Sequence, residues 1–393
     1  MNSLRLQVLN STCNMKSILI IADFASIHIY NFVRNTIDSK NSQVKGLSMS
    51  PIRSIPSDYQ KYYQENNIDV VEESTLPEDS NQTKIKKIKN QLASLGEFDI
   101  LHIHYVKHLY APGIFYNRKH FKKIILSFWG SDFYRSSIIS RAFVLPILRI
   151  ADNITFITSN MKDDFIKKSI FHQGLENRIC VLDYGNMLFP YIDSAKDMIS
   201  KDRIKIYSSF NLSPNKITVT VGYVGREQMQ QKKAIDSFVA HSDKTLYNNV
   251  QFVIPAYGMN ENTLTYLEQT LTENSISHCI ISEFLELDRV ALLRSITDVF
   301  VHPQTTDAFS SSMQECFYAN AIIVNGEWLH YKDAENAGAF FLKFNSFDKL
   351  PLILDDIVKH INYYKEKSSI NKNIMLNLCS WDMWRSKWQS LYE

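Results

Sequence analysis

Short apolar runs typical of β-strands alternate with helical patterns along almost the whole chain, in two separate series. The first series has strand candidates at residues 17–22, 99–104, 124–128, 153–158 and 179–183, with helical patterns such as 84–95 and 161–168. After a polar stretch, residues 193–215, the second series has strand candidates at 217–224, 251–256, 279–282, 298–302, 321–325 and 340–344. Such alternation produces parallel sheets covered by helices on both faces. We therefore expect an α/β protein with two doubly wound, Rossmann-like domains, residues 1–195 and 196–370, and a C-terminal helix, residues 371–393.

The composition fits a folded chain without a general affinity for nucleic acid. Of the 393 residues, 45% are hydrophobic and 12% aromatic, and the net charge is only +2. No apolar run approaches the roughly 18 residues that a membrane span requires. The five cysteines contain no Cys-x-x-Cys pair, which argues for a reducing, cytoplasmic compartment and against a zinc site. The first 14 residues lack the apolar core of a signal peptide, and Met15 is a candidate translation start.

One block, residues 303–324, carries two carboxylates, Asp307 and Glu315, eight positions apart. Eight positions are about 2.2 turns of helix, so Asp307 would be rotated away from Glu315 if both belonged to one helix. Asp307 is therefore expected in the loop after Pro303, above the first turn of a helix that residues 310–312 can cap with their hydroxyls. Unpaired N–H groups and the helix dipole favour an anion at such a place, so a phosphate could be held there without a metal.

The spacing of two acids is weak evidence by itself, since about 4 such pairs are expected by chance, but the whole block resembles the signature of the retaining glycosyltransferases of family 4. Asp307 stands at the first Glu of that signature, Ala308 and Ser310 at its first two glycines, Asn320 at its third glycine and Ile322 at its proline. Asn tolerates a left-handed backbone after a helix. Ala308 would cost roughly 1 kcal/mol if the loop needed a positive φ at that position.

A second part of the resemblance is Gly225-Arg226 at the end of the strand 217–224, followed by Lys232. In the family these positions hold the donor diphosphate, whose charge grows as the glycosidic bond breaks and must be offset by cations. The alternative is a solvated basic turn. The resemblance also implies that Glu315 holds the nucleotide ribose. It further implies that the donor sugar and diphosphate are held by Asp307 and the neighbouring Ala308, Phe309 and Ser310.

In the N-terminal half, the candidates for contacts with the acceptor or the cleft are His28, His104, Trp129 and Asp132. His102 and His104 share one face of a strand, either as a metal pair or as satisfied histidines at a strand end. Trp129 stands where many family members have a histidine that touches the donor sugar. Asp132 either caps the next helix or touches a substrate hydroxyl. His28 is expected at a helix N-terminus, where it could contact the acceptor or stabilise phosphate.

Basic and aromatic residues are mixed between positions 115 and 149, and residues 1–200 hold 24 basic against 19 acidic residues. This mixture suits an anionic membrane surface, at about 1 kcal/mol per cation near the lipid. An ordinary solvated face is the alternative.

The resemblance implies the GT-B fold, with its two domains facing a central cleft, and a C-terminal helix that packs back on the N-terminal domain. It implies a retaining, metal-independent hexosyltransferase that uses a nucleotide-sugar donor and no cofactor. No Asp-x-Asp triplet is present, which argues against the metal-dependent GT-A class. By analogy we expect a saccharide or lipid-linked saccharide acceptor in O-antigen or capsule assembly, with the enzyme cytoplasmic or peripheral on the inner face of the cell membrane. The alternatives are a sugar-nucleotide epimerase of the same fold and a degenerate, non-catalytic partner of an active transferase.

Overall fold

The computed structural model describes residues 15–168 and 174–393. The expectation about the first 14 residues lies outside this range. By internal packing the chain forms two compact units. The first extends through Ile157 and adds Phe165–Leu182 and Arg385–Glu393, and the second comprises Thr158–Asp164 and Asp183–Trp384.

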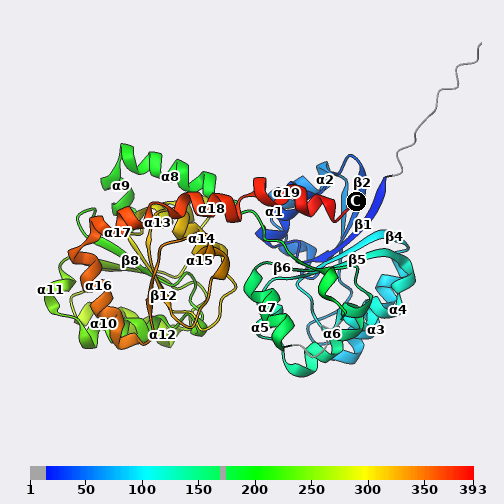
Figure 1. The fold of residues 1–393 in the computed structure, drawn as a ribbon, viewed down its shortest axis with the longest axis horizontal. Helices are drawn as coiled ribbons and strands as arrows, with labels where there is room; N and C mark the ends of the chain where they lie inside the picture. Colours follow the sequence, from blue (N-terminus) through cyan, green and yellow to red (C-terminus); the bar gives the residue numbers. More distant parts are fainter. Residues whose placement is uncertain (1–14, 169–173) are drawn as a thin grey trace, which may run out of the picture. The chain divides into compact units, whose positions relative to one another are not determined.

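The first unit is built on a seven-stranded parallel sheet with the order β3-β2-β1-β4-β5-β6-β7. Its strands are β1 (Lys16–Ala22), β2 (Ser42–Ser48), β3 (Ile68–Glu72), β4 (Phe98–His104), β5 (Phe121–Phe128), β6 (Asn153–Phe156) and β7 (Ile179–Val181). Its helices are α1 (Ile27–Thr36), α2 (Ser57–Glu65), α3 (Asn81–Ser94), α4 (Tyr110–Tyr116), α5 (Ser131–Tyr134) and α6 (Ile138–Ile150), while α7 (Ser159–Lys168) begins in the second unit. Figure 1 shows the helices on both faces of this sheet.

The second unit repeats the same topology in a six-stranded parallel sheet with the order β10-β9-β8-β11-β12-β13. Its strands are β8 (Ile217–Val221), β9 (Val250–Pro255), β10 (His278–Ile281), β11 (Val299–His302), β12 (Ile322–Gly326) and β13 (Leu342–Phe344). Its helices are α8 (Phe189–Lys201), α9 (Arg203–Ser208), α10 (Gln231–His241), α11 (Lys244–Tyr247), α12 (Glu261–Glu273), α13 (Leu287–Ile296), α14 (Ser311–Tyr318), α15 (Lys332–Asn336), α16 (Leu350–Lys359), α17 (Ile361–Ser368) and α18 (Asn371–Cys379). Both strand orders are doubly wound, so the predicted fold class is confirmed.

The central strands of both sheets are continuous apolar runs, because helices cover them on both faces. Ile18 to Ala22 of β1 are all buried, and so is every residue of β9. The sequence pattern missed β2 and β3, which form one edge of the first sheet. β3 is Ile-Asp-Val-Val-Glu with a single fully buried residue, Ile68, so it lacks the apolar signal of an inner strand.

The two units divide at Asp183, earlier in the chain than the boundary after residue 195 expected from sequence. The reason is α8, which packs on α13 of the second unit as a whole. Its buried residues include Ile192 and Ala195, which join the same apolar core as Ile296 of α13. A helix that buries one face against α13 cannot be divided at its middle.

The C-terminal segment, expected as one helix, forms two: α18 ends at Cys379, Ser380 is extended, and α19 (Trp381–Ser390) begins anew. Within the first unit, Trp388 is fully buried and its ring lies 5.0 Å from that of Phe32. Tyr392, two residues past α19, hydrogen-bonds His102 through its hydroxyl, 2.6 Å from Nδ1. Trp388 and Tyr392 of this segment therefore supply core side chains to the first unit.

Candidate active site

Two loops of the second unit lie side by side where its strand order reverses. They follow β8 and β11, which are adjacent parallel strands. The N–H of Thr305 donates to the carbonyl of Gln228 at 3.0 Å, and Gln230 Nε2 donates to the carbonyl of Pro303 at 2.7 Å. Ligands of doubly wound sheets bind at such a switch point, beyond the carboxyl ends of the strands. The loop that carries Arg226 is thus joined to the loop that carries Asp307.

Gly225 is required by the close approach of another loop. A Cβ at this position would lie 2.3 Å from the carbonyl oxygen of Ala256. The N–H of Gly225 donates to the carbonyl of Tyr257 at 2.9 Å. The next residue, Arg226, is exposed, and within residues 15–168 and 174–393 it has no ion-pair partner. A guanidinium without a partner on this loop is available for an anionic ligand.

Lys232, in contrast, already has partners within the second unit. Its Nζ lies 2.7 Å from Asp236 Oδ2 and 3.7 Å from the centre of the Tyr266 ring, and Tyr266 donates its hydroxyl to Asp236 Oδ1 at 2.8 Å. The hydrogen bond with Asp236 raises the pKa of Lys232. A diphosphate would therefore have to replace Asp236 as the partner of this ammonium group.

Asp307 lies in the loop before α14, as predicted from its spacing to Glu315. Its Oδ2 accepts the N–H of Ser310 at 3.0 Å and the hydroxyl of Tyr331 at 2.8 Å. Ser310 occupies the N-cap position, but its hydroxyl makes no capping bond. The carboxylate of Asp307 thus binds an N–H just before the helix, and Tyr331 fixes its orientation.

The left-handed position in this loop is Phe309, with φ 63°, and not Ala308. The strain of roughly 1 kcal/mol considered for Ala308 therefore falls on Phe309, whose side chain is buried with its ring 5.1 Å from that of Tyr331. Burial of a phenyl ring contributes more than this cost. At the other end of α14, Asn320 has φ 66°, so its predicted left-handed conformation is confirmed.

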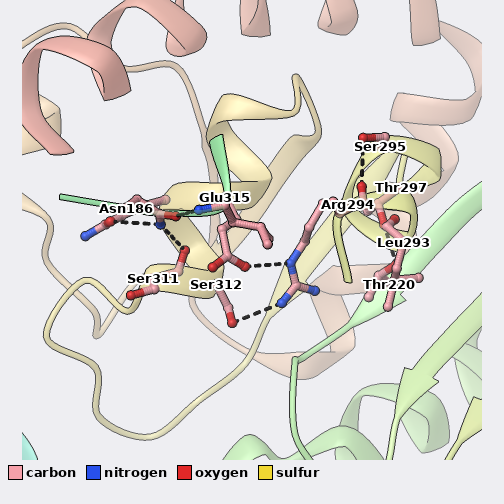
Figure 2. Close-up of polar contacts among 12 residues, drawn as sticks. Asn186, Thr220, Leu293, Arg294, Ser295, Thr297, Ser311, Ser312 and Glu315 are labelled. Carbon is pink, nitrogen blue, oxygen red and sulfur yellow. Dashed lines mark hydrogen bonds and ion pairs between the residues drawn. The ribbon is translucent and has the colours of Figure 1, made fainter. Parts of the chain in front are cut away.

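Glu315 is buried and forms an ion pair with Arg294, which the sequence analysis missed. Arg294 Nε donates to Glu315 Oε2 at 3.0 Å, and Arg294 Nη2 donates to Ser312 Oγ at 3.0 Å, as Figure 2 shows. Both charged side chains are nearly inaccessible to solvent: 5% of the Arg294 side chain and 11% of the Glu315 side chain is exposed. The available signal was a cation in an otherwise apolar helical run, Leu292-Leu293-Arg294-Ser295-Ile296. Glu315 is thus held in one orientation by a cation from α13.

The start of α14 is also hydrogen-bonded to the segment that follows β7. Asn186 Nδ2 donates to the carbonyl of Ser311 at 3.2 Å, visible in Figure 2, and to Gln314 Oε1 at 3.2 Å. Gln314 Nε2 donates to Asp183 Oδ2 at 3.3 Å. Gly185 has no room for a side chain, since a Cβ would lie 2.2 Å from the Trp381 ring. The helix that carries Glu315 is therefore positioned by residues far from it in sequence.

Asp183→Asn is expected to remove part of the pH dependence of stability. Burial raises the pKa of Asp183 from its ordinary 3.8 to about 7. From about pH 4 to pH 7 the unfolded chain loses this proton while the folded protein keeps it, so the free energy of unfolding falls as pH rises. The Asn variant stays neutral throughout. Urea unfolding across this range should show wild type losing stability relative to the variant as pH rises; parallel curves would contradict the assignment.

In the first unit, the two histidines of β4 are buried and uncharged. His102 Nδ1 and Nε2 are hydrogen-bonded to Tyr392 and Ser127, at 2.6 Å and 2.7 Å, and burial lowers the pKa of His102 to about 3. Burial also lowers the pKa of His104, whose ring lies 4.0 Å from that of His102. The part of the chain that the structure describes contains no group of three His, Cys, Asp or Glu residues placed to hold a metal ion.

Asp132 binds backbone rather than capping α5. Its Oδ1 accepts the N–H groups of Trp129 and Gly130, and its Oδ2 accepts that of Val106, all at 2.9 Å. Burial raises its pKa to about 6. Asp132 therefore fixes the loop after β5, which presents Trp129. The imidazole of His28, exposed in the first turn of α1, lies edge-on to the Trp129 ring at 5.7 Å.

The first unit matches a known protein family. Residues 17–160 match a family model described as Glycosyl transferase 4-like. No curated protein sequence matches the chain at a significant level.

Solved structures of similar fold cover nearly the whole chain. A glycosyltransferase from Rickettsia africae has a TM-score of 0.70 at 11% identity, over 97% of this chain and 99% of that one. HepE of Anabaena, in complex with UDP and glucose, has a TM-score of 0.68 at 11% identity, over 95% and 98%. The UDP-GlcNAc 2-epimerase from Neisseria meningitidis, bound to UDP-GlcNAc, has a TM-score of 0.61 at 14% identity, over 96% and 100%.

The fold and the family match point to one class: the chain has the GT-B fold of the glycosyltransferases that it resembles, and residues 17–160 match a glycosyl transferase 4-like domain. This match supports the resemblance to family 4, and it lies in a different part of the chain from the C-terminal motifs that first suggested it.

Proposed function

We propose that the protein transfers a sugar from a nucleotide diphosphate donor to a hydroxyl of a saccharide acceptor, with retained anomeric configuration and without a metal. The observation that carries the proposal is the joined pair of loops after β8 and β11, with the exposed Arg226 on one loop and the oriented carboxylate of Asp307 on the other. HepE, which has the same fold, binds UDP and glucose. A diphosphate placed between these loops would meet a cation, backbone N–H groups and a helix N-terminus.

In the proposed reaction, the bond between the anomeric carbon and the donor phosphate breaks, and a bond to the acceptor oxygen forms. The acceptor proton passes to the departing diphosphate, and Arg226 and Lys232 offset the negative charge that develops there. Asp307 and the backbone of Ala308 and Phe309 hold the donor sugar. Glu315 accepts hydrogen bonds from the ribose hydroxyls through the oxygen that Arg294 does not bind.

We further infer that the acceptor is a lipid-linked saccharide in the assembly of a surface polysaccharide such as an O-antigen or capsule, on the cytoplasmic face of the cell membrane. None of the helices in residues 15–168 and 174–393 is long and apolar enough to cross a bilayer. The enzyme would then reach such an acceptor as a peripheral protein.

The proposal is tested by a thermal-shift screen of nucleotide sugars, followed by turnover with the donor that stabilises the protein most. We expect release of the nucleoside diphosphate only when an acceptor is present, unchanged by EDTA, and a product with the anomeric configuration of the donor. Inverted product, or activity abolished by EDTA and restored by a divalent cation, would contradict the retaining or the metal-independent part.

Two alternatives make different predictions for the same assays. The likeness to a UDP-GlcNAc 2-epimerase keeps an epimerase open, and such an enzyme would convert the donor when no acceptor is present. A degenerate partner of an active transferase would bind the donor but would show no turnover, whichever acceptor is added. Analysis of the products formed from donor alone identifies an epimerase. Measurement of both donor binding and turnover with acceptors distinguishes an active transferase from a non-catalytic partner.

A further inference from the structure

The outward faces of α4 and α6 in the first unit expose large apolar side chains. Ile138 and Ile139, at the start of α6, are 84% and 71% exposed. Phe143 of α6 and Phe115 and Tyr116 of α4 are each at least half exposed. These five residues are named the α4–α6 face below. Soluble surfaces rarely collect bulky apolar groups in this way, and such patches mark interaction sites.

A groove of about 350 Å³ runs along this face, between the two helices. Its lining consists only of alanine, proline and aromatic residues, among them Pro112, Phe115, Phe143 and Pro146. The groove offers no hydrogen-bonding side chain other than the Tyr116 hydroxyl. It therefore fits an aliphatic chain better than a sugar or a peptide, whose polar groups would be left unpaired there.

Apart from Ser140, Arg141 and Arg149, α6 is apolar on both sides, unlike an ordinary surface helix. Its inward side buries Val144, Ile147 and Leu148 in the first unit, while its outward side bears the exposed isoleucines and Phe143. A helix that is apolar all round belongs in a protein core or in contact with lipid. With 13 residues α6 is shorter than the roughly 20 that span a bilayer, so its outward side is suited to lie on a membrane and not across it.

The segments that form and flank the α4–α6 face are rich in cations, of which Arg118, Lys122 and Lys87 pair with Asp152, Asp99 and Asp79 from other segments. Residues 105–151 contain eight Lys and Arg but one acid, Asp132, which is buried and bound to backbone N–H groups. The neighbouring α3 carries four lysines and no acid, and it packs against α4, which in turn packs against α6 (Figure 1). Lys119 and Arg135 follow α4 and precede α6 and are exposed. Among the described residues neither has an acidic partner.

We propose that the α4–α6 face, with Lys119 and Arg135 at its edges, is a docking surface for an anionic lipid bilayer. The apolar side chains enter the boundary of the acyl chains, and the cations meet the negative headgroups. This proposal does not depend on the proposed function, because vesicle binding is measured without donor or acceptor.

The test is flotation of the full chain with vesicles of phosphatidylcholine containing about one third phosphatidylglycerol, beside vesicles of phosphatidylcholine alone. We expect binding to the anionic vesicles at low salt, weakened by added salt. Ile138→Ser/Ile139→Ser/Phe143→Ser and, separately, Lys119→Glu/Arg135→Glu should each lower the partition coefficient about tenfold or more. Matched controls on the second unit are Phe284→Ser, which changes another exposed aromatic, and Lys201→Glu/Lys244→Glu, which reverses the charge of two other exposed cations.

Thermal unfolding checks that each variant is folded, and the charge variant changes only exposed residues. Absence of wild-type binding to anionic vesicles at low salt would overturn the proposal. So would an equal loss in the second-unit controls. Equal binding to both vesicle types would overturn the anionic part. A wild-type protein that does not float, but elutes as a dimer that the apolar variant breaks, would instead assign this face to a second copy of the chain.

Discussion

An Arg294→Met protein should lose about 3–5 kcal/mol of unfolding free energy, because removal of one partner leaves a buried charge without compensation. Glu315 would keep its carboxylate in an environment where only 11% of its side chain reaches solvent, and Ser312 would lose its guanidinium donor. Urea denaturation monitored by far-UV circular dichroism measures the change. The same variant should bind a nucleotide-sugar donor poorly, since nothing would then orient Glu315.

Two further variants separate the lost charge pair from simple damage to α13. Arg289→Met removes a half-buried arginine of the same helix, which stacks on Phe210 at 3.9 Å and donates to the hydroxyl and carbonyl of Ser209, and should cost only about 1 kcal/mol. Arg294→Met/Glu315→Met replaces both charges by apolar groups and should recover most of the stability, but not donor binding. Recovery of donor binding in this double variant would contradict the role of Glu315 in holding the ribose. A stability loss equal to that of Arg289→Met would contradict the buried ion pair.

An Arg226→Ala enzyme should turn over about 100-fold more slowly or worse, the usual cost of removing one electrostatic stabiliser of a departing group. Arg226 is exposed and has no acidic partner in the described residues, so its full charge is available to the diphosphate. Release of nucleoside diphosphate measures the loss, with UDP-glucose as the first donor tried because HepE is known with that ligand bound. The fold should be unaffected, since Gly225 and not Arg226 makes the tight contact with Ala256.

Lys232→Ala should lower turnover as well, but by less, because Asp236 already neutralises part of the charge of Lys232. Lys233→Ala is the control: Lys233 is the adjacent lysine, and its Nζ binds Gln230 Oε1 at 2.9 Å. Turnover at the wild-type rate in Arg226→Ala would contradict the assignment of Arg226 as a cation that stabilises the departing diphosphate. A larger loss of turnover in Lys233→Ala than in Lys232→Ala would indicate that Lys233, and not Lys232, is the second cation that binds the diphosphate.

The sequence predicted most of the fold because inner strands of doubly wound sheets are buried on both faces and must be continuously apolar. β1, β4 and β9 could be read in this way. β3 lies at a sheet edge and needs only partial burial, so its Ile-Asp-Val-Val-Glu pattern was missed. The break at Ser380 was missed too, because the apolar spacing of Trp381, Trp384 and Trp388 does not show where a helix must turn to pack.

For the site, the sequence correctly placed Asp307 outside α14 and Asn320 in a left-handed conformation, because helical rotation and backbone sterics are local constraints. It considered a positive φ in this loop only at Ala308, and the structure has the positive φ at Phe309. It could not identify the partners of the acids. Tyr331 is 24 residues from Asp307, and Arg294 is 21 residues from Glu315.

The sequence by itself determined the two sheets and the loops that carry the signature residues, because strand burial, helix periodicity and motif spacing are properties of neighbouring residues. The class of chemistry was implied by the resemblance of those residues to family 4. Only the tertiary structure decided how each charge is compensated. Arg294 is buried against Glu315, Lys232 is paired with Asp236, and Arg226 is left exposed. Ion pairing depends on which side chains meet across packed helices and loops, and a desolvated charge must find its partner wherever the fold brings one.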